Sequence, residues 1–115
     1  MTVLLGDGKG GFRPVPGSPF ALPGCVSPRR VAIGDVTGSS DHDFVVTCMN
    51  RAMVLLFFCQ KGGVYRALSV DIPSGKPGEA PAERGVALAD LTGRGRDDVI
   101  VSNGSAGTLT LLLGK

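Results

Sequence analysis

One stretch of this sequence occurs twice and decides the fold: Val31-Ala32-Ile33-Gly34-Asp35-Val36-Thr37-Gly38 returns 55 residues later as Val86-Ala87-Leu88-Ala89-Asp90-Leu91-Thr92-Gly93. The match continues where Asp43-Phe44-Val45-Val46-Thr47 aligns with Asp98-Val99-Ile100-Val101-Ser102. Short apolar runs bounded by Gly and Asp are typical of β-strands. Self-similarity at a fixed period indicates stacked units, none of which can bury its faces alone. The chain is therefore predicted to be an array of small β units.

A second piece occurs three times, at spacings of 52 and 56 residues. It reads Val3-Leu4-Leu5-Gly6 with Lys9-Gly10-Gly11-Phe12, then Leu55-Leu56-Phe57-Phe58 with Lys61-Gly62-Gly63-Val64-Tyr65, and finally Leu111-Leu112-Leu113-Gly114-Lys115. Together the two patterns predict strands at residues 2–5, 12–15, 31–34, 43–48, 53–59, 64–72, 86–89, 98–102 and 107–113.

These strands form one complete four-stranded unit and two partial ones. Four short antiparallel strands per unit is the plan of a β-propeller blade. The predicted fold is therefore all-β, with one complete blade and two partial blades. So few blades cannot close a ring, so the chain is expected to be part of a larger propeller. The remaining blades would come from the same protein or from self-association.

Composition supports this fold class and excludes several others. The 115 residues suit a single domain, and 18 Gly with 8 Pro argue against an all-helical fold. A hydrophobic fraction of 43% with a net charge of only +2 fits neither disorder nor a strong attraction to nucleic acid. The longest apolar run, 52–59, is too short to span a bilayer, and the N-terminus shows no signal peptide. Neither nucleic acid nor a membrane span is expected.

Both copies of the repeat carry the same loop between their first two strands. Residues 35–43 and 90–98 each place Asp at loop positions 1 and 9, Thr at position 3 and Gly at position 4. Oxygen ligands at alternating positions of a tight loop can converge on Ca²⁺, which takes about 6–8 of them. The two loops are therefore the candidate metal-binding elements.

At this point the sequence resembles the FG-GAP/VCBS repeat family. Members of that family join an apolar strand to a loop of the form Asp-x-(Asn/Asp)-x-(Asp/Asn)-Gly-x-x-Asp, then to a second apolar strand and an apolar run ending in Gly-x-Gly-x-Gly-x-Phe. Residues 5–12 match this last piece. The resemblance covers residues 1–115 as one array, with units at about 1–22, 31–72 and 86–115. It implies an integrin-like β-propeller of about six to eight blades, calcium in some loops, a role in adhesion and an extracellular or cell-surface location.

Departures from the family pattern separate the two loops. The first keeps three acids and two hydroxyls, so its candidate calcium ligands are Asp35, Thr37, Ser39, Asp41 and Asp43. In the second loop Arg94 stands at a ligand position, and its guanidinium can pair with Asp90 and Asp98 in place of an ion. Calcium is expected in the first loop only. The alternative for both loops is a turn in which Asp and Thr side chains bond the loop's own N–H groups.

No catalytic constellation is predicted. The Gly6-x-Gly8-x-x-Gly11 pattern is interpreted as a hairpin turn, because a dinucleotide fingerprint needs a helix directly after it. Asn103-Gly104-Ser105 is interpreted as a turn rather than as a glycosylation site, and His42 as a solvated loop residue. The expected function is a non-enzymatic interaction or scaffold module that binds a protein or glycan. The alternative is a set of structural or substrate-positioning blades in a larger enzyme, for example one that degrades polysaccharides.

Two further expectations concern burial. Cys25, Cys48 and Cys59 are interpreted as small buried apolar residues, with at most one disulfide among them. The repeated apolar runs are expected to be largely buried, whereas the strand near 64–72 is expected to be half exposed. These buried runs are 31–33, 44–46, 86–88 and 99–101.

Overall fold

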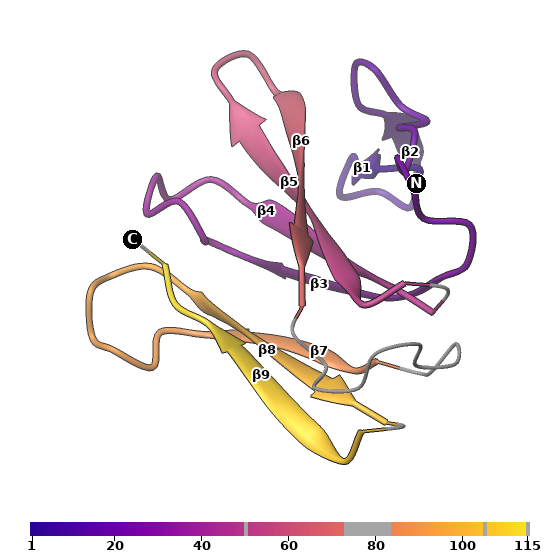
Figure 1. Cartoon of the computed structure of the whole chain (residues 1–115). Helices are drawn as coiled ribbons and strands as arrows, with labels where there is room; N and C mark the ends of the chain where they lie inside the picture. The colour runs from indigo at the N-terminus through magenta and orange to yellow at the C-terminus, as the bar shows by residue number, and fades with distance from the viewer. Residues whose placement is uncertain (50, 73–83, 105, 115) are drawn as a thin grey trace.

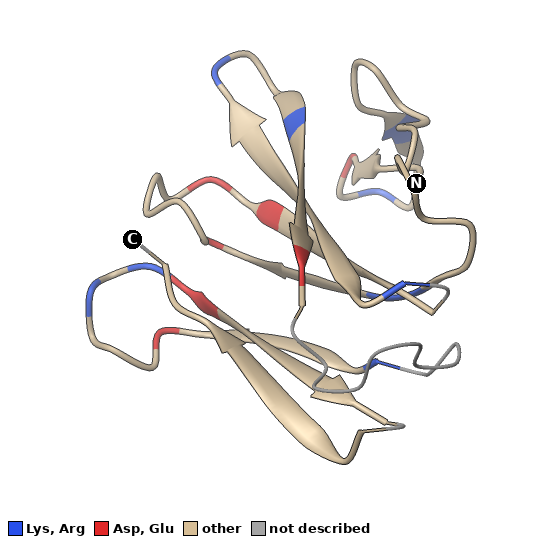
Figure 2. Cartoon of the chain, in the orientation of Figure 1, with Lys and Arg blue, Asp and Glu red and all other residues tan. Residues whose placement is uncertain are grey.

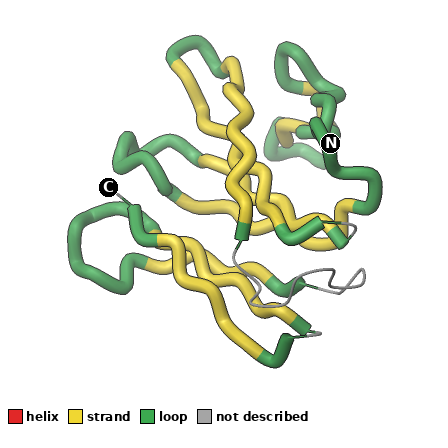
Figure 3. The backbone as a smooth tube through the Cα atoms, in the orientation of Figure 1, coloured by secondary structure: helices red, strands yellow, loops and turns green. Residues whose placement is uncertain are grey.

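The structure, a computed structural model, describes residues 1–49, 51–72, 84–104 and 106–114. Within these residues the chain is all-β, and no helix able to cross a membrane occurs among them. Figures 1 and 3 show the strands and the loops that join them. The nine strands of the described residues are β1 (Leu4–Gly6), β2 (Phe12–Pro14), β3 (Pro28–Gly34), β4 (Asp43–Cys48), β5 (Met53–Gln60), β6 (Val64–Asp71), β7 (Val86–Ala89), β8 (Asp98–Asn103) and β9 (Thr108–Leu112).

These strands form three antiparallel sheets. The N-terminal hairpin pairs β1 with β2, the central sheet has the order β3-β4-β5-β6, and the C-terminal sheet has the order β7-β8-β9. The predicted strands are confirmed, with most of their ends within one or two residues. The largest difference is that β3 begins at Pro28, which lies opposite Cys48, with a register shift before Arg30.

The central and C-terminal sheets pair their strands in the same register. Val31 lies opposite Val46 in the central sheet, and the residues 55 positions later, Val86 and Val101, lie opposite each other in the C-terminal sheet. The second ladder agrees as well: Val45 faces Leu56, as Ile100 faces Leu111. In the C-terminal sheet only the pair Asn103–Thr108 has no counterpart in the central sheet. The two sheets are therefore built on one plan.

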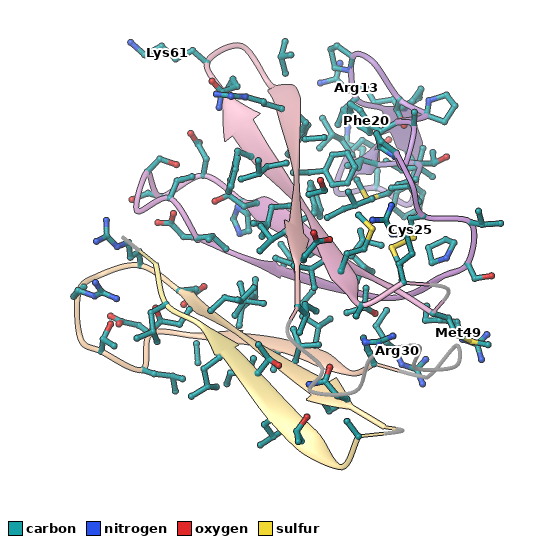
Figure 4. All side chains as sticks on the ribbon, viewed as in Figure 1. Arg13, Phe20, Cys25, Arg30, Met49 and Lys61 are labelled. Atoms are coloured by element: carbon teal, nitrogen blue, oxygen red, sulfur yellow. A yellow bond between two sulfur atoms is a disulfide. The ribbon has the colours of Figure 1, made fainter. Side chains whose placement is uncertain are left out.

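The central sheet lies between the other two and has an apolar cluster on each face. On one face Phe44, Leu55 and Phe57 pack against the N-terminal segment, from which Phe20 contacts Phe57 with ring centroids 6.0 Å apart (Figure 4). The other face packs against the C-terminal sheet. The buried members of this second cluster are Val45, Val54, Leu56, Ile72, Val99 and Val101.

The burial prediction is confirmed for β4 and is wrong for β3. Residues 44–46 are buried, as are Val99 and Val101, but Val31 is 58% exposed and Ile33 is 57% exposed. The reason is that β3 is an edge strand, and the N-terminal segment covers this face mainly over β4 and β5. In β7, Val86 and Leu88 are half-buried against the central sheet, and Ala87 is exposed.

The outermost strand of the central sheet, β6, is more exposed than predicted. Only Tyr65 and Val70 of its eight residues are half-buried. No described strand lies beyond β6 in the sheet, so its outer edge faces solvent.

The interpretation of all three cysteines as unpaired apolar residues is wrong for two of them. Cys25 and Cys48 form a disulfide with a Cα–Cα distance of 5.6 Å, and Cys59 is the free cysteine (Figure 4). The pairing of Pro28 with Cys48 brings the segment before β3 next to the end of β4. The single disulfide that the cysteine count allowed therefore ties the N-terminal segment to the central sheet.

Candidate functional site

The first loop, residues 35–43, folds around the carboxylate of its first residue. The Oδ1 atom of Asp35 accepts hydrogen bonds from the N–H groups of Gly38 at 2.6 Å and Ser39 at 3.0 Å, and Oδ2 accepts one from the Ser40 N–H at 2.8 Å. Gly38 and Ser40 have positive φ values of 76° and 68°, a conformation that glycine adopts readily and that a residue such as Ser rarely adopts. The carboxylate therefore holds the loop in a tight turn.

The last residue of the loop, Asp43, is fully buried and joins the loop to the sheet. Its Oδ2 accepts from the N–H groups of Val36 and Thr37, each at 3.0 Å, and from the Thr37 hydroxyl at 3.2 Å. Its Oδ1 accepts from the N–H of Cys59, near the end of β5, at 3.0 Å. One side chain thus links the loop to the third strand of the sheet.

The second loop, residues 90–98, repeats this geometry. Asp90 accepts from the N–H groups of Arg94 and Gly95, which are the counterparts of Ser39 and Ser40. Asp98 is fully buried like Asp43. It accepts from the Leu91 N–H at 3.1 Å and, through Oδ1, from the Gly114 N–H at 2.8 Å, and Gly114 is the counterpart of Cys59.

Backbone donors lower the pKa values of these carboxyl groups. The N–H groups of Gly95 and Arg94 are the main causes that lower the pKa of Asp90, and the Gly114 N–H is the main cause for Asp98. Burial raises the pKa of Asp35, but the N–H groups of Ser40, Gly38 and Ser39 outweigh it, so the net pKa is lowered. The folded loops therefore stabilise the ionised carboxylates.

The two loops lie side by side at the same end of the two sheets (Figure 2). The N–H of Asp35 donates to Oδ2 of Asp97 at 2.9 Å, and the N–H of Asp97 donates to the carbonyl of Asp35 at 2.7 Å. The sequence did not indicate this contact. Asp97 aligns with His42 of the first loop, so it is not one of the aspartates that the two loops share. Together the loops form one continuous surface, called the loop surface below. Its exposed members include Ser39, Ser40, Asp41, His42, Arg94 and Gly95.

The candidate calcium ligands have the right chemistry, but their oxygens already have partners. Both oxygens of Asp35 and of Asp43 accept N–H groups, and the Thr37 hydroxyl lies 2.9 Å from that of Ser39. Asp41 is exposed. In the described part of the chain, no three His, Cys, Asp or Glu side chains gather closely enough to hold a metal ion. As the side chains lie they do not form a cation site, so calcium stays a prediction and requires some of these bonds to be exchanged.

Arg94 partly fulfils the role predicted for it. Its guanidinium lies 3.6 Å from Oδ1 of Asp98 and donates to the Thr92 hydroxyl at 2.8 Å. Asp90, the other expected partner, accepts the backbone N–H of Arg94. A positive charge therefore lies beside the buried carboxylate of Asp98 in the second loop.

The remaining sequence patterns behave as structural turns. Asp7, between β1 and β2, accepts the N–H groups of Lys9 and Gly11, so the glycine-rich pattern forms a hairpin turn. His42 is exposed in its loop. Asn103 is 1% exposed, and its amide donates to the hydroxyls of Thr108 and Thr110 across the β8–β9 turn. Ser105, the third residue of the Asn103 pattern, lies outside the described residues.

Searches for known proteins similar to this chain gave no match, whether against family models, curated protein sequences or solved structures.

Proposed function

We propose that this chain is a non-enzymatic interaction module built from FG-GAP/VCBS-like β-propeller blades, and that its loop surface binds a protein or glycan. One observation supports the proposal above all: two sheets with equivalent registers stack so that their aspartate loops meet through Asp35 and Asp97. Stacking of equivalent units places equivalent loops side by side. Folds of this kind present such loops as a binding surface, while the fold itself does not specify the ligand.

The C-terminal sheet supports the propeller architecture through the face that it leaves open. Val54 and Leu56 of the central sheet are buried beneath the C-terminal sheet. Their counterparts Leu109 and Leu111 are 69% and 53% exposed. A further unit stacked in the same way would cover these leucines, which is how blades of a propeller follow one another.

A binding array that carries both glycans and extracellular protein domains tests the proposed function. We expect labelled chain to bind at least one member of the array, and Asp41→Ala or Arg94→Ala to weaken that binding about tenfold or more, as at a contact centre. Arg51→Ala is the control, because Arg51 is exposed in the turn between β4 and β5, at the opposite end of the central sheet from the first loop. Binding to no member, or binding that neither loop variant changes, contradicts the proposal.

A further inference from the structure

The two arginines of the second loop differ in what holds their charge. The Arg94 guanidinium lies 3.6 Å from the Asp98 carboxylate and donates to the Thr92 hydroxyl. The Arg96 guanidinium has neither a hydrogen bond nor an ion pair within the part of the chain that the structure describes. Arg94 is therefore paired inside its own loop, and Arg96 is not.

Arg96 lies at the junction of the two loops, with its aliphatic carbons against two glycines. A Cβ atom at Gly38 of the first loop would lie 3.5 Å from Cβ of Arg96, and one at Gly114, after β9, would lie 3.3 Å from its Cδ. Its Nε is buried and has no acceptor among the described residues, whereas its two terminal nitrogens are accessible. Packing therefore holds the side chain in place and leaves its terminal N–H groups open to a ligand.

A half-buried guanidinium without an acceptor is unusual in a folded protein. Arginine carries five N–H donors and stays charged, and buried donors nearly always have a partner. The repeated loop does not require an arginine here, since the counterpart of Arg96 in the first loop is Asp41. The contacts of the folded chain therefore explain the position of this side chain but not its charge.

The charges around Arg96 indicate which kind of acceptor fits. A planar guanidinium pairs well with a carboxylate, through two parallel N–H···O bonds. The loop surface also exposes Asp41 and Asp90. A ligand with many negative charges, such as a polyuronate, would meet these like charges, which lowers affinity. A single carboxylate among uncharged groups meets no such repulsion, and a protein segment with one acidic residue presents this pattern.

We infer that Arg96 binds the carboxylate of a single Asp or Glu side chain in a partner protein. The terminal nitrogens of Arg96 donate to the two carboxylate oxygens, and the neighbouring loop residues contact the uncharged part of the segment. The inference rests on the proposed function, because it names the partner class for the same loop surface.

An array of short peptides, presented to the labelled full chain, tests the inference. Paired members differ only in their central residue, which is Glu in one and Gln in the other, and their remaining positions hold varied uncharged residues. We expect the Glu members to bind about tenfold more tightly than their Gln partners, because Gln lacks the charge that strengthens the hydrogen bonds to Arg96.

Three variants assign the preference to one side chain. Arg96→Met removes the charge and keeps an unbranched stem beside Gly38 and Gly114, so it should abolish the Glu preference without lowering the melting temperature. Arg96→Lys keeps the charge without the planar fork and should retain about a threefold preference. Arg51→Met is the matched control, because Arg51 is exposed at the opposite end of the central sheet, and it should leave the preference unchanged.

Several outcomes overturn the inference. These are no peptide binding, equal binding of Glu and Gln members, and a Glu preference that survives in Arg96→Met. Equal weakening of Glu and Gln members by Arg96→Met also overturns it, since Arg96 then acts only through the shape of the loops. Binding to an oligogalacturonate probe that depends on Arg96, in place of peptide binding, would assign the carboxylate to a glycan.

The failure of this inference is distinguishable from the failure of the proposed function. A chain that binds members of the array of glycans and protein domains, but shows no Glu preference among the peptides, keeps the proposed function and loses the role of Arg96. A chain that binds nothing in either array loses both.

Discussion

The N–H of Asp35 donates to the Asp97 carboxylate, and the N–H of Asp97 donates back to the Asp35 carbonyl, so two residues 62 positions apart tie the central sheet to the C-terminal sheet. The contact lies where the loops emerge, above an apolar interface that includes Val45 and Val99. It combines one backbone pair with one side-chain acceptor. The alignment of the two loops therefore depends in part on a single carboxylate.

Replacing this carboxylate should loosen the junction. We expect Asp97→Ala to lower the free energy of unfolding by about 1 kcal/mol, because the Asp35 N–H loses its acceptor while the apolar interface remains. Denaturant unfolding measures the change. His42→Ala is the matched control, since His42 is the counterpart of Asp97 and is exposed. An equal loss in both variants would show that the Asp97 contact adds nothing specific.

Gly34 explains how closely the sheets approach. A Cβ atom at this position would overlap Oδ2 of Asp97 and would lie 2.9 Å from Cδ1 of Leu88. The counterpart of Gly34 is Ala89, which lies on the face of the C-terminal sheet that no described element covers. Gly34 is therefore required because the C-terminal sheet packs against it. The repeated strand itself accepts alanine at this position, as Ala89 shows.

Gly34→Ala should accordingly destabilise the protein by about 1–3 kcal/mol through overpacking. The reverse change at the counterpart, Ala89→Gly, should lower the free energy of unfolding by about 1 kcal/mol or less, as glycine usually does within a strand. Thermal denaturation of both variants compares them. If the two changes cost the same, the sheets do not approach as closely as the Gly34 contacts indicate.

The sequence predicted the strands well because each is a short apolar run bounded by Gly, Asp or Asn, and because the repeat fixes the alignment of two of the sheets. The offset between Asp43 and Asp98 also predicted that their loops would be alike. The alternative interpretation of the loops, turns closed by Asp and Thr side chains, describes the hydrogen bonds of Asp35 and Asp90.

Features that depend on tertiary neighbours were not predictable. Val31 is exposed because β3 is an edge strand that the N-terminal segment leaves largely uncovered. The apolar pattern of a strand does not indicate which other segments will cover it. The Cys25–Cys48 bridge depends on how the segment before β3 returns to the end of β4. Arg84 is 2% exposed and donates to the carbonyl of Cys48, a burial that a lone arginine in the sequence does not indicate.

Acid should destabilise the folded protein because it protonates the aspartates of the two loops. The pKa values of Asp35, Asp90 and Asp98 are lowered in the folded chain, so the unfolded chain binds protons more readily as the pH falls. Their contribution is complete above about pH 5 and is lost as the pH drops below about 4, the ordinary value for Asp. Melting temperatures measured from neutral pH downward should show this decline.

Asp35→Asn and Asp90→Asn should each flatten the acid decline while lowering stability at neutral pH. Repeating the series at high salt separates this effect from general charge repulsion, which salt screens. An unchanged slope in both variants would assign the acid sensitivity to other groups.

Calcium tests the difference between the two loops. Binding in the first loop should be weak, near 1 mM, because the ion must draw carboxylate oxygens from N–H donors. We expect calcium to raise the melting temperature of the wild type and of Asp90→Ala modestly, and to have no effect on Asp41→Ala. Asp41 is the informative position, since its counterpart is Arg96 and its loss leaves the hydrogen bonds of Asp35 intact. Identical melting curves with and without calcium would show that the first loop does not bind this ion.

The Cys25–Cys48 disulfide should be a main source of stability for the N-terminal segment. It joins residues 23 positions apart, and closing a loop of this length stabilises a protein by about 3 kcal/mol through the unfolded chain. Reduction should therefore lower the free energy of unfolding by roughly that amount, measured by denaturant titration with and without reductant. Cys59→Ser serves as the control, because Cys59 is free and half-buried and its loss should leave the effect of reductant unchanged.

In the reduced protein the amides of Val3 and Phe20 should exchange faster, since both residues pack with their segment on the cluster that contains Cys25 and Cys48. Stability that does not respond to reductant would show that the apolar contacts of Phe20 with Phe57 and Tyr65 suffice to hold the segment in place.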